Sequence, residues 1–148
     1  MVYYGTEILM SGKEEEGHGP MRKDFPGGWP GDTVDAFSGR GLSTAQADAQ
    51  AWMMKLLNYR RQSPALGSGR LLHFIPEDGQ YVYFRIHAEQ RVMVVLNNNE
   101  TDKTLDLSRF GEGLGGHSQG IDVMSGQEFR LADSIPMAHK SIRIIELH

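Results

Sequence analysis

The stretch Tyr81-Val82-Tyr83-Phe84-Arg85-Ile86, followed shortly by Arg91-Val92-Met93-Val94-Val95-Leu96, decides the fold of this chain. In the first run, the apolar residues Val82, Phe84 and Ile86 occupy every second position, which is the period of a strand with one buried face. The second run is apolar after its first residue, as in a strand that is covered on both faces. These two neighbouring strands predict a β-rich domain.

Further strand-like runs flank this pair between residues 67 and 148. Turn-forming clusters separate the runs, among them Glu77-Asp78-Gly79, Asn97-Asn98-Asn99 and Ser125-Gly126. Short strands at this spacing predict an antiparallel β-sandwich. The predicted strands are Leu71–Ile75, Tyr81–His87, Arg91–Asn97, Thr104–Leu107, Gly120–Met124, Glu128–Leu131 and Ser141–Leu147.

Upstream of the strands, the pattern predicts a helix from about Thr44 to Gln62. Ser43 with Gln46 three residues later fits a capping box, and Pro64 marks the end of the helix. Apolar residues recur at helical spacing and form one stripe, which is most simply a core-facing surface. The stripe consists of Ala49, Trp52, Met53, Leu56 and Leu57.

The first 42 residues contain a short β-prone run, Val2-Tyr3-Tyr4, which Gly5 ends, and then a long loop rich in glycine and proline. Strand, loop and helix together constitute one βα unit. In a β/α barrel, the loop after a strand opens on the face that carries the chemistry. A disordered amino-terminal arm has the same composition, so the residues alone leave both interpretations open.

Composition limits the function classes. The 148 residues are 39% hydrophobic and 23% charged, as in globular domains. The net charge of -4 provides no electrostatic footprint for nucleic acid or an anionic membrane, and no apolar run approaches a membrane span. Cysteine is absent and the histidines lack ligand spacing, so no cofactor or metal is expected. No helical pattern follows Gly111-x-Gly113-x-x-Gly116, which predicts a flexible loop instead of a dinucleotide site.

The segments Val2–Ile8 and Arg22-Lys23-Asp24-Phe25-Pro26-Gly27-Gly28-Trp29 resemble the eighth barrel strand and the following loop of α-amylase superfamily glycoside hydrolases, in particular the neopullulanase and cyclomaltodextrinase branch. The segment Asn58–Leu66 resembles the family's exit from the eighth helix. The resemblance implies that residues 1–66 are the last strand, active-site loop and last helix of a (β/α)8 barrel, and that residues 67–148 are the C-terminal β-sandwich domain. The expected fold is mainly β, an antiparallel β-sandwich preceded by the last βα unit of a truncated TIM barrel.

The same resemblance implies a C-terminal fragment of a retaining α-glucan hydrolase. Such enzymes cleave α-1,4 or α-1,6 glucosidic bonds in maltodextrins, cyclomaltodextrins or pullulan. The family's catalytic carboxylates follow earlier strands, so we expect no catalytic residue here and an inactive fragment. Glu7, Asp24, Asp32 and Asp35 are not expected to replace them, because a loop offers no rigid frame to fix a carboxylate pair.

Sugar-binding residues are expected in the loop. Arg22 matches the arginine of the family's loop motif, and Asp24, Phe25 and Trp29 belong to a variant form of that motif. An aromatic ring offers an apolar face to a glucose ring, and Arg and Asp offer planar hydrogen-bond partners. The family's usual acidic residue and proline are replaced here by His18-Gly19. Packing within the loop is the alternative interpretation for Trp29.

The expected partners are an α-glucan oligosaccharide and the remainder of the barrel. An unpaired strand and an uncovered apolar stripe also predict a homodimer through residues 1–10 and the helix at 44–62. A stand-alone sugar-binding or structural β-sandwich module is an alternative, for which Tyr81 and Tyr83 would be the exposed aromatics. An interaction module that uses the sheet edges is a third possibility.

Overall fold

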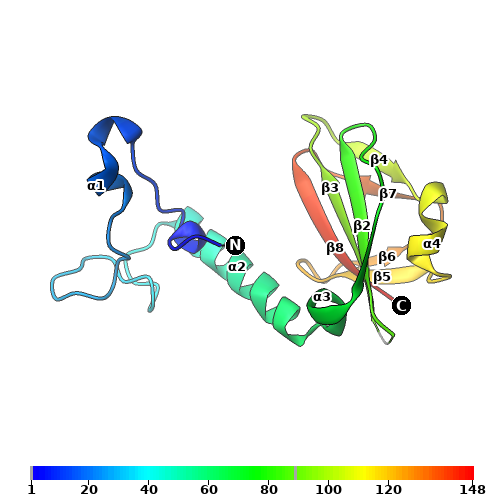
Figure 1. Ribbon diagram of the computed structural model, residues 1–148, viewed down its shortest axis with the longest axis horizontal. Coiled ribbons are helices and arrows are strands. Elements are labelled where there is room, and N and C mark those ends of the chain that lie inside the picture. The colour runs from blue at the N-terminus through cyan, green and yellow to red at the C-terminus, as the bar shows by residue number, and fades with distance from the viewer. Residues whose placement is uncertain (1, 89) are drawn as a thin grey trace. The chain divides into compact units, whose positions relative to one another are not determined.

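The computed structural model describes residues 2–88 and 90–148, except for the side chain of Pro20. The chain divides into two compact units, Met1–Leu57 and Asn58–His148. All strands of the described residues lie in the second unit (Figure 1). The first unit consists of loops, short helices and most of one long helix.

The second unit contains two antiparallel sheets. The larger has the order β1-β2-β3-β8-β5-β6, and the smaller pairs β4 with β7. The predicted antiparallel β-sandwich is therefore confirmed. The strands are β1 (Arg70–His73), β2 (Gln80–Ile86), β3 (Arg91–Asn97), β4 (Lys103–Asp106), β5 (Gln119–Asp122), β6 (Glu128–Arg130), β7 (Ser134–Met137) and β8 (Ser141–Leu147).

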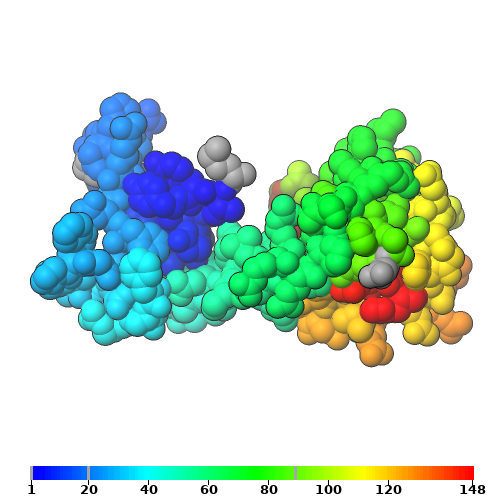
Figure 2. Space-filling view, turned by 60° about the horizontal axis from the view of Figure 1, so that its bottom comes forward, coloured from blue at the N-terminus to red at the C-terminus, as the bar shows by residue number. Residues whose placement is uncertain are grey.

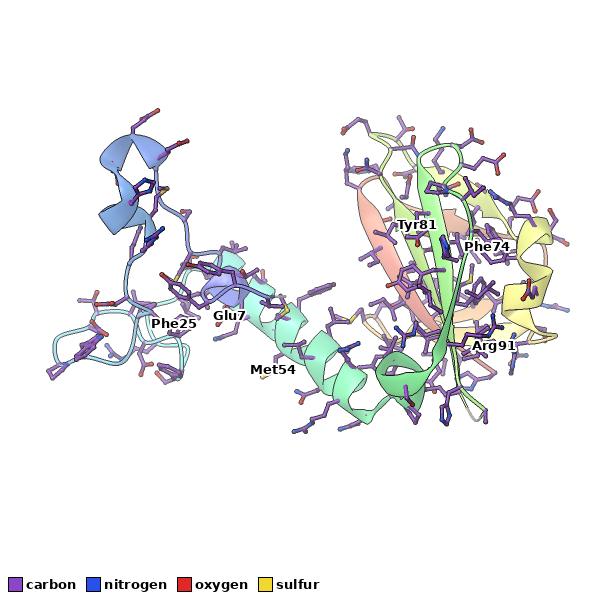
Figure 3. The ribbon with its side chains drawn as sticks, viewed as in Figure 1. Glu7, Phe25, Met54, Phe74, Tyr81 and Arg91 are labelled. Atoms are coloured by element: carbon purple, nitrogen blue, oxygen red, sulfur yellow. The ribbon has the colours of Figure 1, made fainter. Side chains whose placement is uncertain are left out.

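One face of β2, β3 and β8 builds the centre of the core of this unit. Phe84 of β2 is in register with Met93 of β3, which in turn lies opposite Ile145 of β8. All three side chains are fully buried. Side chains alternate along β2, so Tyr81 points away from the core face that carries Phe84. Figure 3 shows Tyr81 and Phe74 on different faces of the sheet, and the ring of Phe74 contacts that of Phe110 in the core.

The strand β7 was not predicted. It contains Pro136, a residue that is usually excluded from a strand interior. The structure places Pro136 opposite Thr104 in the two-stranded sheet. Both strands of such a sheet are edges, and an edge tolerates a residue that lacks an N–H group.

The predicted flexible loop at residues 111–116 was wrong in its first part. Residues Ser108–Phe110 form the 3-10 helix η3, and Gly111–Leu114 continue as the short helix α4. The Arg91 guanidinium donates hydrogen bonds to the carbonyls of Glu112 (3.1 Å) and Gly113 (2.8 Å). A Cβ atom at Gly113 would overlap the ring of Phe84, so the absence of a side chain allows this close approach. Contacts from distant residues thus order the segment.

The helix α2 spans Thr44–Gln62, as predicted. The capping box is present, since the Ser43 amide donates to Oε1 of Gln46 (3.0 Å) and the Gln46 amide donates to Oγ of Ser43 (3.4 Å). A second short helix, α3 (Pro64–Ser68), follows directly. Pro64 occupies its first turn, where the missing N–H costs nothing.

The predicted strand at Val2-Tyr3-Tyr4 was wrong. The Thr6 amide donates to the Tyr3 carbonyl (3.2 Å), and the chain turns into the 3-10 helix η1 (Thr6–Ile8). A strand needs a neighbouring strand for its N–H and C=O groups. No strand among the described residues of the first unit provides one, so local turns satisfy these groups instead. Further along are η2 (Glu14–Glu16) and α1 (His18–Met21).

The carboxyl end of the chain completes the larger sheet. β8 lies between β3 and β5, and His148 exchanges backbone hydrogen bonds with Gln119. In the space-filling view, these last residues (red) lie beside the yellow and orange segments that precede them (Figure 2). The C-terminal strand therefore joins the β1-β2-β3 part of the sheet to β5 and β6.

Candidate functional site: the loop at residues 22–42

Two aspartates give this loop a defined shape. The Oδ2 atom of Asp32 accepts hydrogen bonds from the amides of Gly27 (2.8 Å) and Trp29 (3.2 Å). Gly27 has φ 110°, a conformation that favours glycine, and its Cα approaches Asp35 so closely that a Cβ would clash. The turn that carries Trp29 is therefore held from within the loop.

Asp35 organises the second turn. Its Oδ1 atom accepts the amides of Phe37 (3.0 Å) and Ser38 (3.3 Å), and its Oδ2 atom accepts the Ser38 hydroxyl (2.7 Å). The hydroxyl bond from Ser38 is the main cause that lowers the pKa of Asp35 below its ordinary value. Asp35 is therefore an ionised structural group and is unsuited to act as a general acid.

The loop is also tied to α2. The Gln50 side chain donates to the carbonyl of Ala36 across 2.8 Å, and Ala36 itself is buried. The Asp35 amide donates to the carbonyl of Arg40 (2.8 Å) and closes the turn between them. The loop backbone is therefore held by one hydrogen bond from α2 and one within the loop itself.

The four predicted binding residues differ in their surroundings. Arg22 and Asp24 are exposed, and within the described residues no hydrogen bond or ion pair holds either side chain. Trp29 is 66% exposed. Phe25 is partly buried, and its ring lies 5.3 Å from that of Phe37. The structure thus places Phe25 beside Phe37, which was not among the four predicted residues. It shows no hydrogen bond or ion pair between Arg22 and Asp24.

Phe37 was missed by the sequence analysis. Its ring is 78% exposed although its backbone is fixed by Asp35. The signal that could have found it is local, since an apolar aromatic follows Asp35-Ala36 and precedes Ser38 inside a turn, where polar residues are usual.

A second surface with aromatic side chains lies on the outer face of the six-stranded sheet. The rings of Tyr81 and Tyr83 are 5.6 Å apart, and His73 of β1 approaches Tyr81 edge-on at 6.5 Å. Burial is the main cause that raises the pKa of Tyr83 above its ordinary value. Beside these rings, Val94 is buried, whereas Ile142 is 40% exposed. This face is therefore only partly open.

Polar side chains join the end of α2 to the same sheet. The Tyr59 hydroxyl donates to Oε2 of Glu146 (2.8 Å), and the side-chain Nε2 of Gln90 donates to Oε1 of the same carboxylate (3.0 Å). The side-chain oxygen Oε1 of Gln90 accepts hydrogen bonds from the Ser63 hydroxyl (2.6 Å) and the Ala65 backbone amide (3.1 Å). Burial, followed by the bond to Glu146, raises the pKa of Tyr59 above its ordinary value. This cluster is structural, because its donors and acceptors are used in bonds within the chain.

No group of three His, Cys, Asp or Glu side chains in the described residues is placed to hold a metal ion. In the same part of the chain, none of the helices has both the length and the hydropathy that a membrane span requires.

The fold and the site together define a small antiparallel β-sandwich domain preceded by a helix and an ordered loop. Residues 71–146 match the Cyclo-malto-dextrinase C-terminal domain family. The match covers slightly more than half of the chain, and the chain belongs to this family. The matching family model describes the C-terminal domain of cyclomaltodextrinases.

Solved structures share the fold. An α-amylase from Geobacillus thermoleovorans, complexed with acarbose, matches 99% of this chain at 18% identity and a TM-score of 0.70. An Anoxybacillus α-amylase matches 98% at 19% identity and a TM-score of 0.63. A variant of AmyP in complex with maltotriose matches 80% at 16% identity and a TM-score of 0.67. The chain spans only 29%, 28% and 23% of these three structures.

Proposed function

We propose that this chain is the C-terminal part of a retaining α-glucan hydrolase that cleaves α-1,4 or α-1,6 glucosidic bonds in maltodextrins, cyclomaltodextrins or pullulan. Residues 1–66 would supply the last βα unit of the barrel, and residues 67–148 the C-terminal domain. The catalytic carboxylates would lie on the remainder of the barrel. Family membership supports the proposal, as does the fold shared with an α-amylase solved with acarbose and with AmyP solved with maltotriose.

In this proposal, the loop at residues 22–42 forms one wall of the glucan cleft. Its support is the exposed ring of Trp29 on a backbone held by Asp32, together with the exposed side chains of Arg22 and Asp24. Exposed apolar rings on a fixed backbone lose little entropy when they bind a sugar face. Phe25 completes the group from the base of the loop. The carboxylates of Asp32 and Asp35 are occupied by loop amides and would not contact the sugar.

A titration of the 148-residue chain with maltotriose, followed by amide NMR shifts, tests this function. One wall of a cleft binds weakly, with a Kd on the order of 1 mM or above. We expect shifts at residues 22–38 that saturate, are absent with cellotriose, and weaken in Arg22→Ala. Arg61→Ala, which removes an exposed arginine at the end of α2, is the matched control and should bind like the wild type.

Two outcomes would contradict the proposal. Shifts confined to Tyr81, Tyr83 and their neighbours would assign glucan binding to the sheet face, as expected for a sugar-binding module. The absence of any amide shift with maltotriose or maltoheptaose would contradict glucan binding by the loop.

We also propose that the isolated chain forms a homodimer through residues 1–10 and α2. The support is the exposure of apolar side chains on this helix, with Trp52 at 41% and Leu57 at 46%. Met1 lies outside the described residues, and residues 2–4 do not form the strand that sheet pairing would need. The proposed homodimer therefore rests on the exposed apolar stripe of α2.

A further inference from the structure

We infer that Phe37 is a further glucan-binding residue, which forms with Phe25 an aromatic corner for one sugar ring. This inference rests on the proposed function of the loop. It adds a residue that the loop motif does not contain and a role for the turn at Asp35–Ser38.

The first observation is the exposure of Phe37 on an ordered backbone. Its side chain is 78% exposed, among the most exposed large apolar side chains of the chain. Its amide is held by Asp35 at 3.0 Å, and the preceding Ala36 is buried and accepts the hydrogen bond from Gln50. The backbone thus positions the ring, while packing covers very little of it. Single exposed apolar side chains are common, so exposure alone assigns no role, but it leaves the face of this ring available to a ligand.

The second observation is the geometry of the ring pair. The ring centroids of Phe25 and Phe37 are 5.3 Å apart, and the ring planes are inclined by 58°. Two inclined rings enclose an apolar corner, and the axial C–H groups of a glucose ring are complementary to such a surface. Figure 3 shows Phe25 within the first unit, which also carries the exposed turn at Phe37.

The third observation is the polar surroundings. Ser38 adjoins Phe37, and Asp24 adjoins Phe25 in the sequence. Among the described residues, no partner occupies the carboxylate of Asp24, which leaves it free for a sugar hydroxyl. The Ser38 hydroxyl already donates to Asp35, so Asp24 is the free polar group next in sequence to the ring pair. Apolar rings with a nearby carboxylate suit a neutral sugar, which presents C–H faces and hydroxyl edges together. A purely apolar ligand would leave Asp24 desolvated and unpaired.

The maltotriose titration of the full chain tests the inference with three variants. Phe37→Ala should weaken binding by about 2- to 12-fold, the range expected for loss of one aromatic contact. Phe37→Tyr keeps the ring face and should restore binding. Ile75→Ala removes a side chain of matched exposure (79% against 78%) in the other unit, and should leave binding unchanged.

The loop itself must be monitored, because Phe37→Ala could act by disordering it. The amide shifts of Trp29 and Ser38 report the two aspartate turns and should remain at their wild-type values in the free variant. If Phe37→Ala disturbs them, the comparison moves to Phe37→Leu, which keeps an apolar side chain of similar length but has no ring face.

The outcomes separate this inference from the proposed function. Binding that is weakened by Arg22→Ala and unchanged by both Phe37→Ala and Phe37→Leu would overturn the role of Phe37 and leave the glucan wall intact. A wild-type chain without glucan-induced shifts would overturn both. Weakening by Phe37→Ala with recovery in Phe37→Tyr supports both.

Discussion

The hydroxyl of Tyr59, near the end of α2, donates a hydrogen bond of 2.8 Å to the carboxylate of Glu146 in the last strand, 87 positions away in the chain. Gln90 donates to the other carboxylate oxygen. The three side chains fasten the helix end to the sheet within the second unit. Tyr59 is partly buried, so its hydroxyl needs this partner.

Tyr59→Phe is expected to lower the free energy of unfolding of the second unit by about 1 kcal/mol, a typical value for one lost hydrogen bond. Urea unfolding followed by far-ultraviolet circular dichroism measures it. Tyr4→Phe removes an exposed hydroxyl that donates to the Lys23 carbonyl (3.2 Å) and is the matched control, with little effect expected. A Tyr59→Phe variant that unfolds at the same urea concentration as the wild type would contradict a stabilising bond to Glu146.

The difference between wild type and Tyr59→Phe should also depend on pH. The pKa of Tyr59 is raised in the folded chain, so folding favours the protonated phenol. Its contribution is fully present below the ordinary tyrosine pKa of about 10 and is lost as the pH rises above that value. The gap in unfolding free energy should therefore narrow between neutral and strongly alkaline pH. A gap that widens would contradict the assigned direction.

Gly113→Ala is expected to destabilise the second unit by about 1–3 kcal/mol, the usual cost of overpacking a core. The new Cβ would overlap the ring of Phe84, which is fully buried and cannot move freely. Gly111→Ala in the same short helix meets no atom within 4 Å and is the control. Thermal unfolding of the two variants should differ clearly, and similar melting temperatures would argue against a close contact at Gly113.

A shortened chain that begins at Ser43 should keep the unfolding transition of the sandwich. Among the described residues, the buried hydrophobic cluster contains side chains from Val82 to Leu147, and none from residues 1–42. Calorimetry of both chains tests this. If the shortened chain loses its cooperative transition, the first 42 residues stabilise the sheets in a way that their own contacts do not account for.

Self-association through α2 should be visible by light scattering at high protein concentration. Trp52→Glu is expected to shift the chain towards the monomer, because it places a charge in the apolar stripe. Ala51→Glu adds the same charge on the opposite side of the helix and should leave association unchanged. A wild-type chain that stays monomeric at high concentration would refute the proposed dimer.

The purified chain is expected not to hydrolyse maltooligosaccharides or pullulan, because the proposal assigns the nucleophile and the acid/base to the remainder of the barrel. Reducing-sugar assays measure this. Turnover above the buffer control that is abolished by Asp24→Ala would overturn the assignment and place a catalytic carboxylate in the loop.

The aromatic side chains of the loop show how far sequence reasoning reaches towards the candidate site. Trp29 and Phe25 were found because they belong to a motif, and their role in binding stays a prediction. Phe37 was not found, since its importance lies in an exposure that depends on where Asp35 and Gln50 hold the backbone. A motif identifies residue types, whereas exposure is a property of the folded loop.

The sequence by itself determined the features that depend on local chemistry. The period of two in Tyr81–Ile86 predicted β2, and the pair Ser43 and Gln46 predicted the start of α2, because neighbouring residues decide both. Only the tertiary structure decided β7, α4 and the turn from Tyr3 to Thr6. Pro136 lies in a strand because Thr104 is opposite it, and Gly113 is helical beside Phe84 and Arg91. Val2–Tyr4 is not a strand, because a β-prone run becomes a strand only when a partner accepts its backbone hydrogen bonds and no described strand pairs with it.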